Sequence, residues 1–192
     1  RPLDTGELRL VAALFIIAGI GTSMVWYAVS GAVDFWSARY GADVYGLLLF
    51  VYNGPALAVL VSQMLFDDKI DDRFGSIAAY GARAVIAYAM LALSCVALFV
   101  MQHTPDQKPY FLIIVAVVGV ADGIGYGSLS QMASKLHPRA STAFFIGQSL
   151  ASFLLLGYTI GIGFDGAADE AQLREYFTFV LAFVFVAGAA LF

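Results

Sequence analysis

Asp122, Arg83 and Gln148 are the side chains best placed to do chemistry, because each stands inside a long apolar stretch. A carboxylate, a guanidinium or an amide in such a stretch marks a site for a polar solute or an ion, or a contact between helices. The i, i+4, i+8 spacing places Asp122 on one helix face with Tyr126 and Ser130. The sequence therefore predicts a small polar site at membrane depth.

The depths of these groups predict an ion pair. At a rise of ~1.5 Å per residue, Arg83, Asp122 and Gln148 lie ~13, ~20 and ~12 Å into their helices, the second from the opposite face. In a hydrocarbon core of ~30 Å these levels nearly coincide. Because an isolated ion there costs at least ~2.5 to 3.5 kcal/mol, we expect Arg83 to pair with Asp122. Such a pair serves either a substrate or gating site or the structure alone, and both remain open.

Other kinds of chemistry find little support in the sequence. Catalysis needs a nucleophile with a base, or a metal set, within hydrogen-bond reach, and Ser128 and Ser130 have no histidine nearby on their helix. His103 and His137 stand in separate connections without further ligands at metal-binding spacing. Cys95 is the single cysteine, so no intrachain disulfide forms. We predict neither an enzyme, nor a metal site, nor another cofactor.

The elements that position these residues are predicted to be membrane helices. Of the 192 residues, 61% are hydrophobic and only 12% are charged, about half the charge of an ordinary soluble domain. This composition excludes a soluble globular domain. The net charge of −4 supplies no basic surface for nucleic acid. We therefore expect an all-α integral membrane protein whose partners include lipids and exclude nucleic acid.

Six stretches are each near the ~20 residues that a helix needs to cross a bilayer. Membrane strands are disfavoured because the stretches are long and show no polar alternation. The connections are too short to hold a soluble domain. We predict one six-helix membrane domain over residues 1–192, with spans at 10–33, 44–66, 76–101, 109–134, 140–164 and 173–192.

Basic residues are unevenly shared between the two ends of this bundle. Cations are enriched in cytoplasmic connections, so the richer side predicts the orientation. Both termini are therefore expected on the cytoplasmic (or matrix or stromal) side. The cations on the side of the N-terminus are Arg1, Arg9, Lys69, Arg73, Lys135 and Arg139, against Arg39, Lys108 and Arg174 on the other side.

Glycines four residues apart predict surfaces of close helix packing. Gly119, Gly123 and Gly127 form such a stripe in the fourth span. Gly157 and Gly161 repeat the spacing in the fifth span. We expect both helices to approach a neighbour closely at these positions.

Four short motifs resemble the equilibrative nucleoside transporters. Residues 19–26 read GIGTSMVW, similar to the GxGTxxPW signature of that family's first helix. Arg83 stands early in the third span, as in the family, and residues 127–129 read GSL where the family has a QGS-like sequence. Residues 147–151 read GQSLA, close to the family's GQGLAG. The motifs follow the family's order from Leu10 to the end of the chain.

The resemblance implies half of a major-facilitator-like transporter, in which six helices pack against a second bundle around a central nucleoside site. Trp26 would then stack on, or pack against, the base. Tyr126 occupies the position of a glutamine that hydrogen-bonds the nucleobase, so Tyr126, Asp122 and Gln148 are the remaining candidates for polar contacts. An aromatic face with a few convergent polar groups is what an apolar-walled nucleobase pocket requires.

The departures from the family pattern concern both motif and length. Val25 replaces the family's proline, Tyr27 its asparagine and Tyr126 its glutamine. The family has eleven helices, and its second half supplies the Asp and Arg that hold the ribose. Because six helices do not enclose an alternating-access path, we expect a second bundle, from a longer chain or from a homodimer partner.

Two functions therefore remain open. The first is facilitated diffusion of nucleosides or nucleobases, completed by the second bundle. The alternative is a transport-inactive, transporter-derived structural subunit of a larger membrane complex, such as an organellar respiratory or photosynthetic one, which the eroded motif and short connections favour. The face that carries Asp122 and Tyr126 would meet water in the first case, and a neighbouring protein or lipid in the second.

Overall fold

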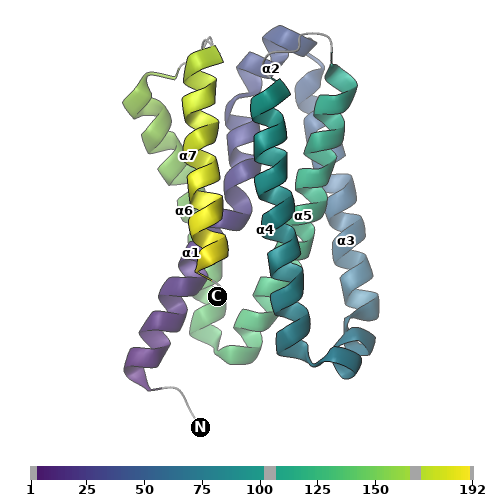
Figure 1. Ribbon diagram of the computed structural model, residues 1–192, viewed down its shortest axis with the longest axis vertical. Coiled ribbons are helices and arrows are strands. Elements are labelled where there is room, and N and C mark those ends of the chain that lie inside the picture. Colours follow the sequence, from purple (N-terminus) through teal and green to yellow (C-terminus); the bar gives the residue numbers. More distant parts are fainter. Residues whose placement is uncertain (1–3, 102–106, 165–169, 191–192) are drawn as a thin grey trace.

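The computed structural model consists of helices, which the sequence predicts (Figure 1). It describes residues 4–101, 107–164 and 170–190, and no strand occurs among them. The side chains of residues 68 and 70–74 lie outside this description. The helices are α1 (Thr5–Gly31), α2 (Val33–Tyr40), α3 (Val44–Phe74), α4 (Ser76–Met101), α5 (Lys108–Leu136), α6 (Pro138–Ile162) and α7 (Glu170–Ala189).

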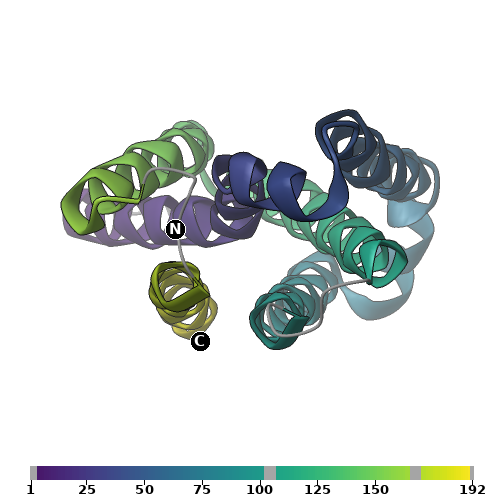
Figure 2. The same ribbon diagram turned by 90° about the horizontal axis from the view of Figure 1, so that it is seen from above.

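Six of these helices are long and apolar enough to cross a membrane: α1, α3, α4, α5, α6 and α7. The short helix α2 lies across one end of the bundle, between α1 and α3 (Figures 1 and 2). The expected all-α bundle of six transmembrane helices is thereby confirmed. Helix α3 runs on to Phe74, eight residues beyond the expected end of its span.

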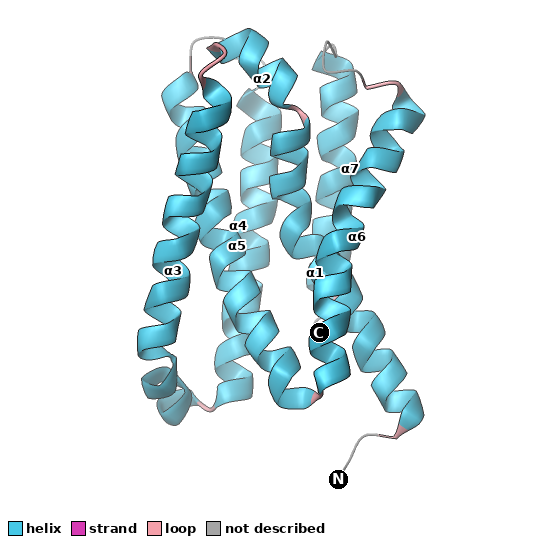
Figure 3. Ribbon diagram, turned by 180° about the vertical axis from the view of Figure 1, so that it is seen from behind, coloured by secondary structure: helices cyan, strands magenta, loops and turns pink. Residues whose placement is uncertain are grey.

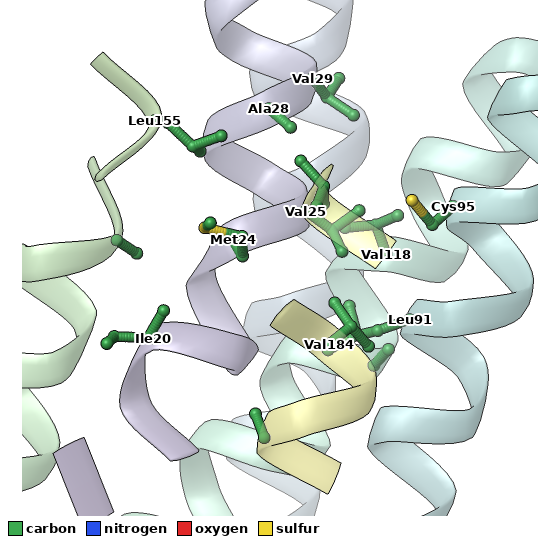
Figure 4. Packing of buried hydrophobic residues seen from close by; sticks show 14 of the residues in the cluster. Ile20, Met24, Val25, Ala28, Val29, Leu91, Cys95, Val118, Leu155 and Val184 are labelled. Atoms are coloured by element: carbon green, nitrogen blue, oxygen red, sulfur yellow. The ribbon is translucent and has the colours of Figure 1, made fainter. Parts of the chain in front are cut away.

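The spanning helices form two layers, which Figure 2 shows from above. One layer contains α6, α1, α5 and α3 in that order, and we call it the four-helix layer; the other contains α7 and α4. Buried apolar side chains join the layers, among them Val25 of α1, Leu91 of α4, Val118 of α5 and Val184 of α7 (Figure 4). The apolar core therefore lies between the layers.

The direction and pairing of the helices divide the bundle into two three-helix repeats. Helices α1, α4 and α6 run one way and α3, α5 and α7 the other (Figures 1 and 3). The first repeat (α1, α3, α4) and the second (α5, α6, α7) therefore have opposite orientations. Equivalent pairs pack alike: α1 on α6 as α5 on α3, and α1 on α7 as α5 on α4. Such inverted repeats occur within each six-helix half of major-facilitator transporters.

The glycine stripe of α5 packs against α3. A Cβ atom at Gly119 would overlap the carbonyl oxygen of Tyr52, and one at Gly123 would lie 2.9 Å from that of Ala56. At Gly127 it would overlap the amide oxygen of Gln63. The predicted close packing of this stripe is confirmed, because backbone atoms of α3 leave no room for a side chain at Gly119 and Gly123, and Gly127 lies against the Gln63 side chain.

Close packing on α6 occurs at a different glycine from those predicted. A Cβ at Gly147 would overlap the carbonyl oxygen of Ile16 on α1, whereas nothing lies within 4 Å of one at Gly157 or Gly161. The prediction for Gly157 and Gly161 is therefore wrong. Helices α1 and α6 approach at Gly147, and Gly157 lies ten residues, or about 15 Å, farther along α6.

Candidate functional site

Trp26, Tyr52 and Asp122 form a cluster that links three helices of the four-helix layer. The ring of Trp26 on α1 stacks on that of Tyr52 on α3, with centroids 3.8 Å apart and planes inclined by 8°. The Tyr52 hydroxyl donates a hydrogen bond to Oδ2 of Asp122 on α5. Sequence reasoning selected Trp26 and Asp122 and missed Tyr52, which connects them.

Asp122 is buried in the centre of this cluster. The residue is 9% exposed, and its Oδ1 atom is buried without a hydrogen-bond partner among the described residues. Tyr88 of α4 lies near enough to interact electrostatically with the carboxyl group, although its own hydroxyl donates to the carbonyl of Ala18 at 2.7 Å. Among the described residues, no lysine, arginine or histidine forms an ion pair with Asp122.

Arg83 has a different partner from the one predicted. Its Nη1 atom lies 2.5 Å from Oδ1 of Asp67 on α3, and Gln131 of α5 donates to Oδ2 of Asp67 at 2.8 Å. The predicted pair between Arg83 and Asp122 is therefore wrong. Asp67 lies seven residues before the end of α3 and Arg83 seven residues after the start of α4, so both lie ~10 Å from the same end of the bundle. Asp122 is fourteen residues from the end of α5, about twice as deep.

Tyr126 and Gln148 lie outside the cluster, nearer the end of the bundle at which α1 begins. Tyr126 is half-buried beside Phe144 of α6, with ring centroids 6.1 Å apart. The Gln148 backbone lies against Gly19, seven residues or ~10 Å along α1 from Trp26, and its side chain has no hydrogen bond within the described part of the chain. The four predicted contact residues thus spread along the layer, and the structure brings only Trp26 and Asp122 into one cluster.

The inverted repeats relate two of the predicted residues to each other. Gly19 lies against the carbonyl oxygen of Phe144 as Gly119 lies against that of Tyr52, so residue n of α1 corresponds to residue n + 100 of α5. The stacked pair Trp26 and Tyr52 then corresponds to the neighbouring pair Tyr126 and Phe144. Each repeat therefore contributes one aromatic pair to the four-helix layer.

Asp122 breaks this internal symmetry. Its counterpart in α1 is Thr22, whose hydroxyl donates to carbonyl groups of its own helix, at 3.0 Å to Gly19 and 3.3 Å to Ala18. A hydroxyl that is hydrogen-bonded within its own helix costs little free energy in a membrane, whereas a carboxyl group costs much more. The carboxyl group is thus particular to the second repeat.

A cavity of about 560 Å³ lies between α3, α4 and α5. Asp67 and Arg83 line one end, and most of the remaining wall is apolar, including Val59 and Ile124. Its volume is typical of ligand pockets. None of the residues predicted for substrate contact lines this cavity. Arg83, which was predicted for the ion pair, does line it.

The histidines and the cysteine show structural contacts where they are described. His137 caps α6, its Nδ1 atom accepting a hydrogen bond from the backbone of Arg139 at 3.1 Å. The buried Cys95 thiol donates to the carbonyl of Phe177 at 3.4 Å. No group of three metal-ligating side chains occurs among the residues that the structure describes, and His103 is not among them.

Comparisons with known proteins give one weak likeness. No protein-family model and no solved structure matches the chain. Cytochrome c oxidase subunit 1 of Thermostichus vulcanus is 25% identical over 196 aligned positions, which cover 96% of the chain and 35% of that protein. The chain therefore spans about a third of that relative's length. The class of helical membrane protein therefore rests on the six helices that are long and apolar enough to cross a membrane.

Proposed function

We propose that this bundle is one half of a solute transporter of the equilibrative nucleoside type, completed by a second helical bundle. The observation that carries the proposal is the pair of inverted three-helix repeats. Transporters built from inverted repeats hold their substrate near the membrane midplane, at the interface of the repeats. The Trp26–Tyr52–Asp122 cluster links the two repeats, since it joins α1 and α3 of the first repeat to α5 of the second, and this supports it as the proposed substrate position.

A nucleoside or nucleobase is the proposed substrate. Trp26 and Tyr126 would offer aromatic surface from the two repeats, and Asp122 and Gln148 polar contacts. Tyr52 covers one face of the Trp26 ring, so a base would stack on the other face or pack against the ring edge. The four motifs that resemble the nucleoside transporters support this substrate class.

The second bundle is proposed to cover the four-helix layer. Further residues of a longer chain or a second copy would supply it. The excess of lysine and arginine in the connections on the side of the N-terminus favours placing both termini on the cytoplasmic side, or its organellar equivalent.

Uptake by proteoliposomes that contain the full chain tests this function. Labelled uridine and adenosine should enter saturably, and Trp26→Ala should reduce uptake about tenfold, which corresponds to ~1.4 kcal/mol of lost binding. Phe185→Ala is the matched control, because Phe185 lies on α7 in the other layer and is 61% exposed. Equal uptake by the two variants, both folded, would remove Trp26 from the site.

The second candidate is a structural subunit of a larger membrane complex. The likeness to cytochrome c oxidase subunit 1 along 96% of the chain favours it. Native membranes extracted in mild detergent would then yield the chain at fixed stoichiometry with other subunits. Absence of uptake together with such an assembly would establish this candidate in place of transport.

A further inference from the structure

Asp122 has no counter-ion among the residues that the structure describes, although it lies at the centre of a membrane helix. It is the middle residue of α5, fourteen residues or about 21 Å from either end. The nearest intramembrane cation in the expected scheme, Arg83, is held by Asp67 instead. A bare carboxylate at this depth is strongly disfavoured, and a bound proton removes its charge.

We propose that Asp122, with Tyr52 as its hydrogen-bond donor, is a proton-binding site whose carboxyl group carries a proton at neutral pH. The proton comes from water and returns to water, so the carboxylate and the acid are the two states of the site. Coupling of this proton to solute movement rests on the proposed transport function, whereas proton binding itself does not.

The groups around the carboxyl favour a proton over an ion pair. Tyr52 of α3 donates to Oδ2, and Oδ1 is buried with no partner, which leaves it available for the proton. Two more titratable groups are linked to the site. Tyr88 of α4 interacts with Asp122, but its proton is already donated to Ala18. Tyr27 of α1 interacts electrostatically with Tyr52. From α1 the cluster receives the uncharged Trp26 ring, and no charged side chain of the described residues reaches the site.

A bound sodium ion would need several oxygen ligands, whereas a proton needs one. Among the described residues, only the Tyr52 hydroxyl is hydrogen-bonded to an oxygen of Asp122, and it points its hydrogen toward the carboxyl. A hydrogen pointed at the site disfavours a cation. The hydrogen bond from Tyr52 also stabilises the carboxylate, so what favours the proton is the burial of the group away from water. The arrangement therefore selects a proton.

Infrared spectroscopy of the full chain in liposomes tests the proposal without requiring transport. At pH 7 the spectrum should contain a carbonyl band of a protonated carboxylic acid, above the amide I region. Asp122→Asn should abolish the band, and Tyr52→Phe should keep it but raise its frequency, because one hydrogen bond to the group is lost. Asp43→Asn is the control: the hydrogen bond from Lys108 lowers the pKa of the exposed Asp43, so its loss should leave the band unchanged.

A spectrum without the band, or a band that survives in folded Asp122→Asn, would overturn the proposal. A pH gradient imposed on the same liposomes then tests coupling, which would make the transport proton-driven in place of equilibrative: the gradient should drive uptake by the parent chain and not by Asp122→Asn. Uptake driven by sodium in place of the pH gradient, with no acid band, would assign the site to a cation. A band that depends on Asp122 without any uptake would uphold proton binding while the transport function fails.

Discussion

Replacing Asp67 by asparagine should destabilise the bundle far more than replacing Asp122. Oδ1 of Asp67 pairs with Arg83 and Oδ2 accepts from Gln131, and both ion-paired side chains are mostly buried, at 10% and 15% exposure. Asparagine keeps one acceptor oxygen and turns an NH2 group toward one of the two donors. Breaking a buried ion pair costs ~3–5 kcal/mol, and partial exposure places this pair near the low end, at about 3 kcal/mol.

Asp122→Asn should cost less than about 1 kcal/mol, because the new amide oxygen still accepts from Tyr52 and no cation loses a partner. Unfolding of the parent and both variants in mixed micelles with increasing dodecyl sulfate would give the two free-energy differences. Combining Asp67→Asn with Arg83→Gln should recover part of the loss, since it removes the cation that has lost the Asp67 carboxylate. A loss for Asp122→Asn as large as that for Asp67→Asn would refute the assignment of partners and restore the pair between Arg83 and Asp122.

Two further predictions concern helix packing and the loop end of the bundle. Gly119→Ala and Gly147→Ala should each destabilise by ~1–3 kcal/mol through overpacking against a neighbouring backbone, whereas Gly157→Ala, with open space around it, should not; equal melting temperatures for the three would contradict the packing. The hydrogen bond from Lys108 lowers the pKa of Asp43, so it stabilises the fold at neutral pH and is lost as acid protonates the carboxyl. Asp43→Asn should therefore lower the melting temperature slightly at pH 7 and leave it unchanged in acid; a pH-independent difference would contradict this.

The number and place of the spanning helices follow from the sequence, because uncharged apolar runs of about twenty residues are typical of membrane-spanning helices. The end of α3 does not follow from the same rule. Residues 67–73 read DDKIDDR, a typical polar connection by composition, yet the helix continues through them to Phe74. Gly75, at φ 81°, is the stop signal, since glycine commonly takes the left-handed position after a helix.

This boundary decided the predicted partner of Arg83. Ending the helix at Phe66 moves Asp67 into solvent and leaves Asp122 as the nearest intramembrane acid. Eight more helical residues correspond to about 12 Å, enough to bring Asp67 level with Arg83. A depth counted in residues from the end of a helix is therefore only as accurate as the predicted position of that end.

Tyr52 was missed for another reason, since nothing in its own helix marks it. The signal lies in the packing of α1 and α5, where Gly19 and Gly119 each meet a carbonyl of a neighbouring helix and thereby align Trp26 with Tyr126. An internal repeat of this kind places α3 against α5 as α6 lies against α1. The carbonyl that meets Gly119 then identifies Tyr52 as the residue beside the carboxyl-bearing face.

The contacts between the repeats fix the pair of Tyr52 and Asp122. They do not fix whether water can reach the carboxyl group and exchange its proton. Gly119 and Gly123 hold the α3 and α5 backbones together on either side of Asp122, so the hydrogen bond from Tyr52 should persist as the bundle moves as a unit. What can change is the cover over Trp26, which is partly buried whereas Tyr52 and Asp122 are buried. If a second bundle provides that cover, its position controls when water reaches the carboxyl group. We therefore expect the Asp122 proton to exchange readily in the uncovered bundle and slowly once a second bundle is in place, and a deuterium-induced shift of the acid band would measure both rates.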